Sequence, residues 1–354
     1  MKKSLLLAMC LCGALYAKPL VTTTILPTKY FVEQISGDTL DVVALVEKGA
    51  DPHTYEPKPS QMKSVEKSQL HFEVGMEFDE MWLPRLQKQF PNLEIVQTQN
   101  GIEKIAMAPH HHSHDHHHGQ CPHHHDEDHM HNDGVEAMND DNDHDHKECS
   151  HHHDHGHHHH HGDMAHHTHD MAHHMHNHHH GQCPHHHGHH HSGLDPHIWT
   201  DPILVKIQAK NIKDALVKKF PTNKEKYEKN YAKFIKVLDD FDQQTSKKLS
   251  NLKNNKFIVY HPSWGYFAKR YNLVQIPIEV EGKEPKPADL KELIEEAKEE
   301  DIKVIFVAPQ FSKKSAKIIA KESGAKVVEI DQLPENWLKE MKKTVDIFAK
   351  ALNK

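Results

Sequence analysis

The chain has 354 residues, which is enough for two domains of ordinary size and one additional segment. Its formal net charge is −8, but residues 110–193 alone carry −13, so the remainder carries only +5. A remainder so mildly basic, without clustered arginines and lysines, excludes a nucleic-acid-binding protein. Of the 42 histidines, 38 also lie in 110–193. This segment therefore differs in kind from the rest of the chain.

The first 17 residues, MKKSLLLAMCLCGALYA, have the pattern of a secretory signal peptide. Two lysines precede an apolar run that is too short to span a membrane and that ends in the small residue Ala17. We therefore predict a signal peptide over 1–17 and export of a mature protein that does not cross a membrane. Cys10 and Cys12 leave the alternative of a lipid-modified cysteine, although the large residues before them do not suit lipoprotein cleavage.

Residues 18–109 predict an N-terminal α/β lobe. Short apolar runs rich in valine, isoleucine and threonine alternate with segments of helical pattern. Such alternation is typical of β-α-β units and of a largely parallel sheet. The expected strands are 20–25, 41–46, 71–74 and 94–97, and the expected helices are 28–35, 60–67 and 79–89.

Residues 110–193 contain almost no aliphatic side chains, so they cannot bury enough apolar surface to offset their ordering entropy. We predict a disordered loop whose imidazoles and carboxylates associate with zinc, nickel or copper in many interchangeable arrangements. Its three thiols, Cys121, Cys149 and Cys183, cannot all pair with one another and cannot link the folded lobes. Because a flexible site must become ordered at each binding event, we do not expect the principal metal site here.

After this loop, residues 194–221 complete the N-terminal lobe with a helix over 202–220. Residues 222–253 predict a long linking helix, because apolar side chains recur every three or four positions from Tyr227 to Leu252. Thr222 and Glu225 have the spacing of a capping box at its start. A helix of about thirty residues is roughly 45 Å long, which is more than one small domain needs.

Residues 254–354 repeat the strand–helix alternation and predict a C-terminal lobe. The fold class is therefore α/β, with two similar lobes of mainly parallel sheets joined by a long helix, which the family resemblance described below implies to be rigid. The expected strands are 257–261, 274–280, 303–309 and 326–330, and the expected helices are 264–271, 287–300, 312–323 and 335–352.

Four histidines lie outside the histidine-rich loop, and three of them occupy other loops. His53 follows the second strand, His197 precedes a helix, and His261 is expected at the end of a strand. Asp331 follows the last expected strand. Alone, each would be an ordinary core or capping residue, but together they match the ligands of a tetrahedral zinc ion. His71 lies within an expected strand, so we interpret it as structural.

Five motifs in chain order carry a family resemblance, namely DPHTYEPKPSQ, DPHIWTDP, YHPSWGYFAKRYNL, EGKEPKPADL and EIDQL. They resemble successive motifs of the metal-binding solute-binding proteins of ABC transporters, of the zinc-uptake ZnuA type, over nearly all of the mature chain outside 110–193. The resemblance implies a metal site in the cleft between the lobes, with His53, His197, His261 and Asp331 as ligands. It also implies a monomeric periplasmic protein that captures Zn²⁺ and delivers it to an inner-membrane ABC permease.

The choice of metal depends mainly on His261. Manganese-binding relatives carry glutamate at the matching position, and imidazole suits zinc better than manganese. Asp331 either is the fourth ligand of the tetrahedral ion or does not bind it, in which case water is the fourth ligand. Glu56 could be an outer partner of His53, although an exposed loop carboxylate is the simpler interpretation.

Catalysis is not expected, because the sequence has neither an HExxH pair nor a nucleophile–base signature. Two other functions stay open. In the first, the chain stores or detoxifies metal through the histidine-rich loop. In the second, it is an adhesin of the same fold with a structural metal. Delivery of manganese or nickel is a variant of the main hypothesis.

Overall fold

The computed structural model describes residues 17–107, 193–280 and 282–353. The predicted signal peptide, apart from Ala17, and the predicted metal-binding loop, apart from Gly193, lie outside these residues. Among the helices of the described residues, none is both long enough and apolar enough to span a membrane.

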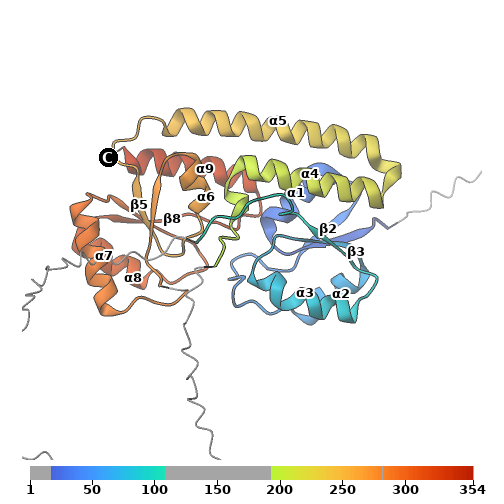
Figure 1. The fold of residues 1–354 in the computed structure, drawn as a ribbon, viewed down its shortest axis with the longest axis horizontal. Coiled ribbons are helices and arrows are strands. Elements are labelled where there is room, and N and C mark those ends of the chain that lie inside the picture. Colours follow the sequence, from blue (N-terminus) through green and yellow to red (C-terminus); the bar gives the residue numbers. More distant parts are fainter. Residues whose placement is uncertain (1–16, 108–192, 281, 354) are drawn as a thin grey trace, which may run out of the picture. The chain divides into compact units, whose positions relative to one another are not determined.

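The first lobe contains a four-stranded sheet in the order β2-β1-β3-β4, and every strand pair is parallel. In Figure 1, α2 and α3 lie on one side of this sheet, and α1 and α4 lie on the other. The lobe is therefore a three-layer α/β unit, as the strand–helix alternation predicts. Its first elements are β1 (Leu20–Thr23), α1 (Leu26–Ser36), β2 (Asp41–Ala44), α2 (Pro59–Lys67), β3 (Ser68–Glu73), α3 (Glu77–Gln89) and β4 (Glu94–Gln97).

The second lobe repeats this topology, with a parallel sheet in the order β6-β5-β7-β8. Helices α7 and α8 pack together on one side of the sheet, and α9 lies on the other (Figure 1). All four residues of β7 are buried, as expected for a central parallel strand covered on both faces. The elements are β5 (Lys256–Val259), α6 (Gly265–Arg270), β6 (Val274–Pro277), α7 (Pro287–Glu299), β7 (Val304–Val307), α8 (Lys314–Ser323), β8 (Lys326–Glu329) and α9 (Trp337–Leu352).

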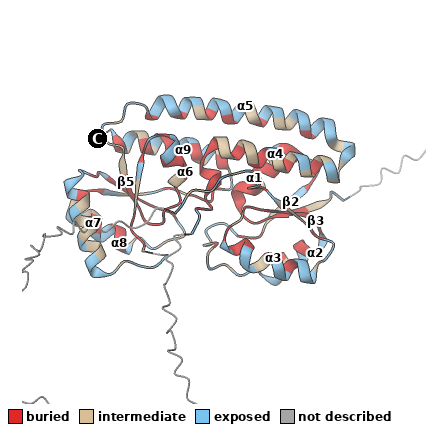
Figure 2. Ribbon diagram, viewed as in Figure 1, coloured by how far each residue is buried: buried red, intermediate tan, exposed pale blue. Residues whose placement is uncertain are grey.

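Helix α4 (Pro202–Lys219) completes the first lobe, and helix α5 (Lys224–Leu249) connects the two lobes. Helix α5 packs against α1 and α4 of the first lobe and against α9 of the second. Figure 2 shows that α5 is buried along one face and exposed along the other, which is the amphipathic pattern expected from the sequence. The long connecting helix is thus confirmed, and its contacts with both lobes explain its length.

The predicted start and end of this helix were wrong by a few residues. Residues Pro221–Asn223 form a short 3₁₀ turn, so α5 begins at Lys224 rather than at Thr222. Asn223 takes the N-cap position without a side-chain hydrogen bond, and the expected capping box does not form. The helix ends at Leu249 and has 26 residues.

Aromatic side chains also join the lobes directly. Phe31 of α1 contacts Trp337 of α9 with ring centroids 5.4 Å apart, and Phe241 of α5 contacts the same indole at 5.7 Å. The indole Nε1 of Trp337 donates to the carbonyl of Trp199, and Trp199 Nε1 donates to the carbonyl of Gln332. Buried aromatic pairs contribute about 0.5–1.5 kcal/mol beyond their area burial, so this cluster stabilises the arrangement of the two lobes.

Candidate metal centre

Three histidines that are distant in sequence converge between the two lobes. His53 lies in the loop after β2, His197 directly precedes the Ile198–Thr200 turn before α4, and His261 lies two residues beyond β5. The Nε2 atom of His261 is 3.2 Å from the Nε2 atoms of both His53 and His197. All three ligand atoms lie within 4.8 Å of one another, and no other such group of His, Cys, Asp or Glu occurs in the described part of the chain.

The loop around His53 is held by local hydrogen bonds. The Asp51 carboxylate accepts from the His53 backbone N–H at 3.0 Å and from the Thr54 hydroxyl at 3.2 Å. Pro52, which lies between Asp51 and His53 in the sequence, is buried. Further along, the Gln61 amide donates to the carbonyl of Leu45 at 2.6 Å, which fastens the start of α2 to the end of β2. These contacts fix the backbone of His53 before any ligand binds.

The buried His197 is positioned by its neighbour Asp195. The Oδ1 atom of Asp195 accepts from the His197 backbone N–H at 2.9 Å and pairs with the ring Nδ1 at 2.7 Å. The Thr200 hydroxyl donates to the His197 carbonyl, and the Trp199 indole packs edge-on against the imidazole. The ring therefore has little freedom to rotate.

His261 is oriented by two side chains of the second lobe. Its Nδ1 atom pairs with Oε1 of Glu279 at 2.7 Å, and its ring stacks on Phe311 with centroids 4.9 Å apart. Glu279 follows β6, where its backbone N–H donates to the carbonyl of Tyr260. Because β5 and β6 are neighbours, the sheet itself brings the glutamate beside the histidine.

Each of the three imidazoles thus has a carboxylate on its Nδ1 side, with Glu77 at 3.2 Å from His53 Nδ1. A carboxylate that accepts the Nδ1 proton leaves the Nε2 lone pair free and orients the ring toward an ion. The Asp195 and Glu279 side chains are only 1% and 7% exposed, whereas Glu77 is 53% exposed. Glu56 is exposed, which agrees with its interpretation as an exposed loop carboxylate rather than an outer partner of His53.

These carboxylate partners were missed in the sequence. Only Asp195 has a local signal, because it precedes its histidine by two residues in an Asp-Pro-His motif. Glu77 and Glu279 are separated from their histidines by long stretches of chain, and no periodicity or spacing links them.

Burial and carboxylates act in opposite directions on the histidine pKa values. Burial lowers the pKa of His53, but the hydrogen bond and charge of Glu77, with smaller contributions from Asp51 and Glu279, outweigh it and raise the value above the ordinary one. For His197 burial dominates and lowers the pKa, although Asp195 partly offsets it. The hydrogen bond to His53 lowers the pKa of Glu77 to about 2 despite its partial burial.

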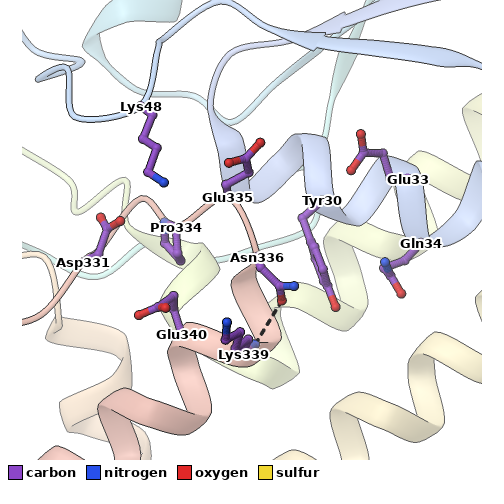
Figure 3. Close-up of a pocket in the computed structure, with 10 residues that line it drawn as sticks. All are labelled: Tyr30, Glu33, Gln34, Lys48, Asp331, Pro334, Glu335, Asn336, Lys339 and Glu340. Atoms are coloured by element: carbon purple, nitrogen blue, oxygen red, sulfur yellow. Dashed lines mark hydrogen bonds between the residues drawn. The ribbon is translucent and has the colours of Figure 1, made fainter.

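Asp331, the fourth predicted ligand, is not a member of the three-histidine group. Its Oδ1 atom accepts from the Leu333 backbone N–H at 2.9 Å and from the Gln310 amide at 3.2 Å. The residue lines a cavity of about 570 Å³ between α1 and the start of α9, together with Lys48 and other polar side chains (Figure 3). None of the three histidines lines this cavity.

His71 lies apart from this group, inside β3. It is fully buried and its ring nitrogens are 3.0 and 3.2 Å from the hydroxyls of Thr22 and Thr24. Burial lowers its pKa to about 3, so the ring is neutral at physiological pH. This environment fits the structural role predicted for it.

Comparison with known proteins places the chain in a family. Residues 21–351 match the sequence model described as zinc-uptake complex component A, periplasmic (ZnuA). The chain belongs to this family. Its members are solute-binding proteins of transport systems, which is the family indicated by the five motifs.

Among the relatives, the high-affinity zinc uptake system protein ZnuA of Bacillus subtilis is 29% identical over 88% of this chain and 78% of its own length. The zinc-binding protein AdcA of Streptococcus pyogenes is 26% identical over 98% of this chain, which spans only 59% of that longer protein. A zinc-bound crystal structure of a ZnuA deletion mutant has a TM-score of 0.70 and 31% identity, and covers 96% of this chain and 99% of its own. The two-lobe α/β fold is therefore that of the family.

Proposed function

We propose that this protein binds one Zn²⁺ between its lobes through the Nε2 atoms of His53, His197 and His261, and delivers it to a membrane permease. One observation carries the proposal: three Nε2 atoms lie within 4.8 Å of one another, and the opposite nitrogen of each ring faces a carboxylate. Three imidazoles with an open fourth position are a typical zinc environment.

The donor atoms favour zinc over manganese. Three imidazole nitrogens suit zinc, copper or nickel, whereas manganese prefers carboxylate and water oxygens. Since all three converging groups are histidines, manganese delivery is the weaker alternative. Nickel remains the alternative to be compared directly with zinc.

Charge compensation also supports a divalent cation. Asp195 and Glu279 are both buried, and within the described residues their ion pairs are with His197 and His261 rather than with lysine or arginine. Buried carboxylates are costly unless a cation compensates them. Two negative charges behind the two imidazoles balance the charge of one bound Zn²⁺.

The fourth position is proposed for Asp331 or for water. Asp331 has one oxygen bonded to Leu333 and Gln310, so binding an ion would require it to leave or share these contacts. Removal of its carboxylate should therefore weaken zinc binding less than removal of a histidine.

In this proposal the protein is a monomeric carrier and not an enzyme. It would be exported by its signal peptide to the periplasm, take up Zn²⁺ there and transfer it to an inner-membrane ABC permease. The family supports this role, since its description is that of a periplasmic uptake component. The histidine-rich loop over 110–193 would collect metal weakly and raise its concentration near the cleft.

The test is competition for zinc between the full mature chain and a chelator strong enough to empty the weak sites of the loop. The wild type should retain one zinc ion, and His53→Ala, His197→Ala and His261→Ala should each lose it. Lys58→Ala is the matched control, because this exposed side chain near His53 pairs only with Glu47 among the described residues. Unchanged retention in all three histidine variants would refute the site.

Delivery requires a separate measurement in cells. Zinc uptake at low external zinc should fall when the protein is deleted and recover with the wild type but not with His197→Ala. Normal uptake in the deletion strain would contradict the transport role and favour storage or adhesion.

A further inference from the structure

A short segment of the second lobe contacts the aspartate that orients a histidine of the first lobe. We propose that Gly265 and Tyr266 are positioning residues for Asp195, Gly265 by leaving room for its carboxylate and Tyr266 by holding its backbone, and that they thereby fix the imidazole of His197. The effect on zinc rests on the proposed function, but the contacts themselves lie within the protein.

Asp195 determines the direction of the His197 ring. The same oxygen, Oδ1, accepts from the His197 backbone N–H and pairs with the ring Nδ1. The aspartate is 1% exposed, so no solvent competes for this oxygen. Any displacement of the carboxylate would therefore move the imidazole and its Nε2 atom.

Gly265 leaves room for the carboxylate on its other side. A Cβ atom added at Gly265 would lie 2.6 Å from Asp195 Oδ2, closer than real Cβ contacts come. Among the described residues this buried oxygen has no hydrogen-bond partner, and it occupies space that a side chain at Gly265 would need. Gly265 is needed here for space, since its φ lies outside the left-handed region.

Tyr266 holds the backbone of the same aspartate. Its hydroxyl donates to the Asp195 carbonyl at 2.8 Å and accepts from the Ile105 backbone N–H at 3.1 Å. The Asp195 N–H in turn donates to the Ile105 carbonyl at 2.8 Å. Three hydrogen bonds thus tie residues 105, 195 and 266 together, and loss of the buried hydroxyl would leave two backbone groups without their partner.

The same segment also carries a ligand. His261 lies four residues before Gly265, so the loop that presents this imidazole leads directly into the start of α6, which contacts Asp195. The Nε2 atom of this histidine is 3.2 Å from that of His197.

The first test replaces Gly265. Gly265→Ala should weaken zinc binding about 10–100-fold in chelator competition, the range typical when an outer partner of a metal ligand is disturbed. Gly193→Ala is the matched control, because a Cβ there meets none of the described residues within 4 Å. In a protein that already carries Asp195→Ala, Gly265→Ala should not weaken zinc binding further, because the Oδ2 atom that the new Cβ would contact is absent. Equal affinity of Gly265→Ala and Gly193→Ala would overturn the proposal.

The second test needs no zinc and remains valid if Gly265→Ala does not fold. The hydrogen-bonded Nδ1–H of His197 should give a downfield proton resonance in the metal-free protein, assigned by its absence in His197→Ala. Tyr266→Phe should shift or broaden this signal, whereas Tyr271→Phe, which removes a hydroxyl bonded to Asp242, should not. An unchanged signal in Tyr266→Phe would contradict the role of Tyr266.

The two tests separate the inference from the proposed function. If the wild type retains no zinc but Tyr266→Phe alters the His197 signal, the zinc site is refuted and the positioning role stands. If zinc binds as proposed but neither substitution changes affinity or signal, only the positioning role is refuted.

Discussion

The two Asp-Pro-His motifs of this chain share a local conformation and differ in their surroundings. In both, the aspartate Oδ1 accepts from the backbone N–H of the histidine two residues later, at 3.0 Å for His53 and 2.9 Å for His197. Asp195 also pairs with the ring of its histidine, whereas the ring of His53 pairs with Glu77 from α3.

This difference in partner and burial gives the two rings opposite pKa shifts. His197 and Asp195 are both buried, and the pKa of His197 is lowered. The His53 side chain is 22% exposed, its partner Glu77 is 53% exposed, and the pKa of His53 is raised. A short motif therefore sets backbone geometry, while the tertiary environment sets the chemistry of the ring.

The largest expected effect comes from removing either imidazole. His197→Ala and His53→Ala should each weaken zinc binding more than about 100-fold, above the range seen for outer partners. We expect the larger loss for His197→Ala, because it also removes the imidazole that pairs with the buried carboxylate of Asp195. Chelator competition measures both. A smaller loss of zinc affinity for His197→Ala than for His53→Ala would contradict the predicted order.

The next effect separates the two carboxylate partners. Asp195→Asn should weaken zinc binding about 10–100-fold, because the Nδ1 contact is short and buried. Glu77→Gln should cost less than about tenfold, because its contact is longer and half exposed to solvent. Titration calorimetry on both variants at the same pH checks the order. Equal losses of zinc affinity in the two variants would mean that the burial of the carboxylate partner does not affect its contribution to binding.

A smaller effect concerns pH. Zinc and protons compete for imidazole, so binding weakens as the pH falls. His53, with its raised pKa, should take up a proton at a higher pH than His197, whose pKa is lowered. Glu77→Gln removes the group that raises the His53 pKa, so the affinity of this variant should fall less between pH 7 and about 6. Zinc affinities of the wild type and of Glu77→Gln, measured across this pH range, test the prediction. A steeper fall of affinity in the variant than in the wild type would contradict it.

The smallest expected effect on the tight site comes from deleting the histidine-rich loop. The chain enters and leaves this loop at adjacent points, because Met107 N–H donates to the Gly193 carbonyl and Asp195 N–H to the Ile105 carbonyl. A short turn can therefore replace 110–193 without moving Asp195. Calorimetry should show fewer weakly bound ions and an unchanged highest affinity. Loss of the tight site would place it in the loop.

Much of the fold could be predicted because its signals are local. Hydrophobic periodicity located the strands and helices, with errors concentrated at their ends, for example at β3, at β6 and at the end of α5. His261 was expected to end a strand but lies two residues beyond β5. The capping box at Thr222 failed because Pro221–Asn223 form their own turn, a competing local structure that the spacing rule does not consider.

The sequence by itself determined the alternation of strands and helices, the membership of the family and the three histidines that converge. Each depends on residue order over short stretches, or on motifs that fold alike in different surroundings. Only the tertiary structure decided which carboxylate faces each imidazole, why Gly265 must lack a side chain and where Asp331 points. These features depend on contacts between elements far apart in the chain, and packing rather than local preference determines such contacts.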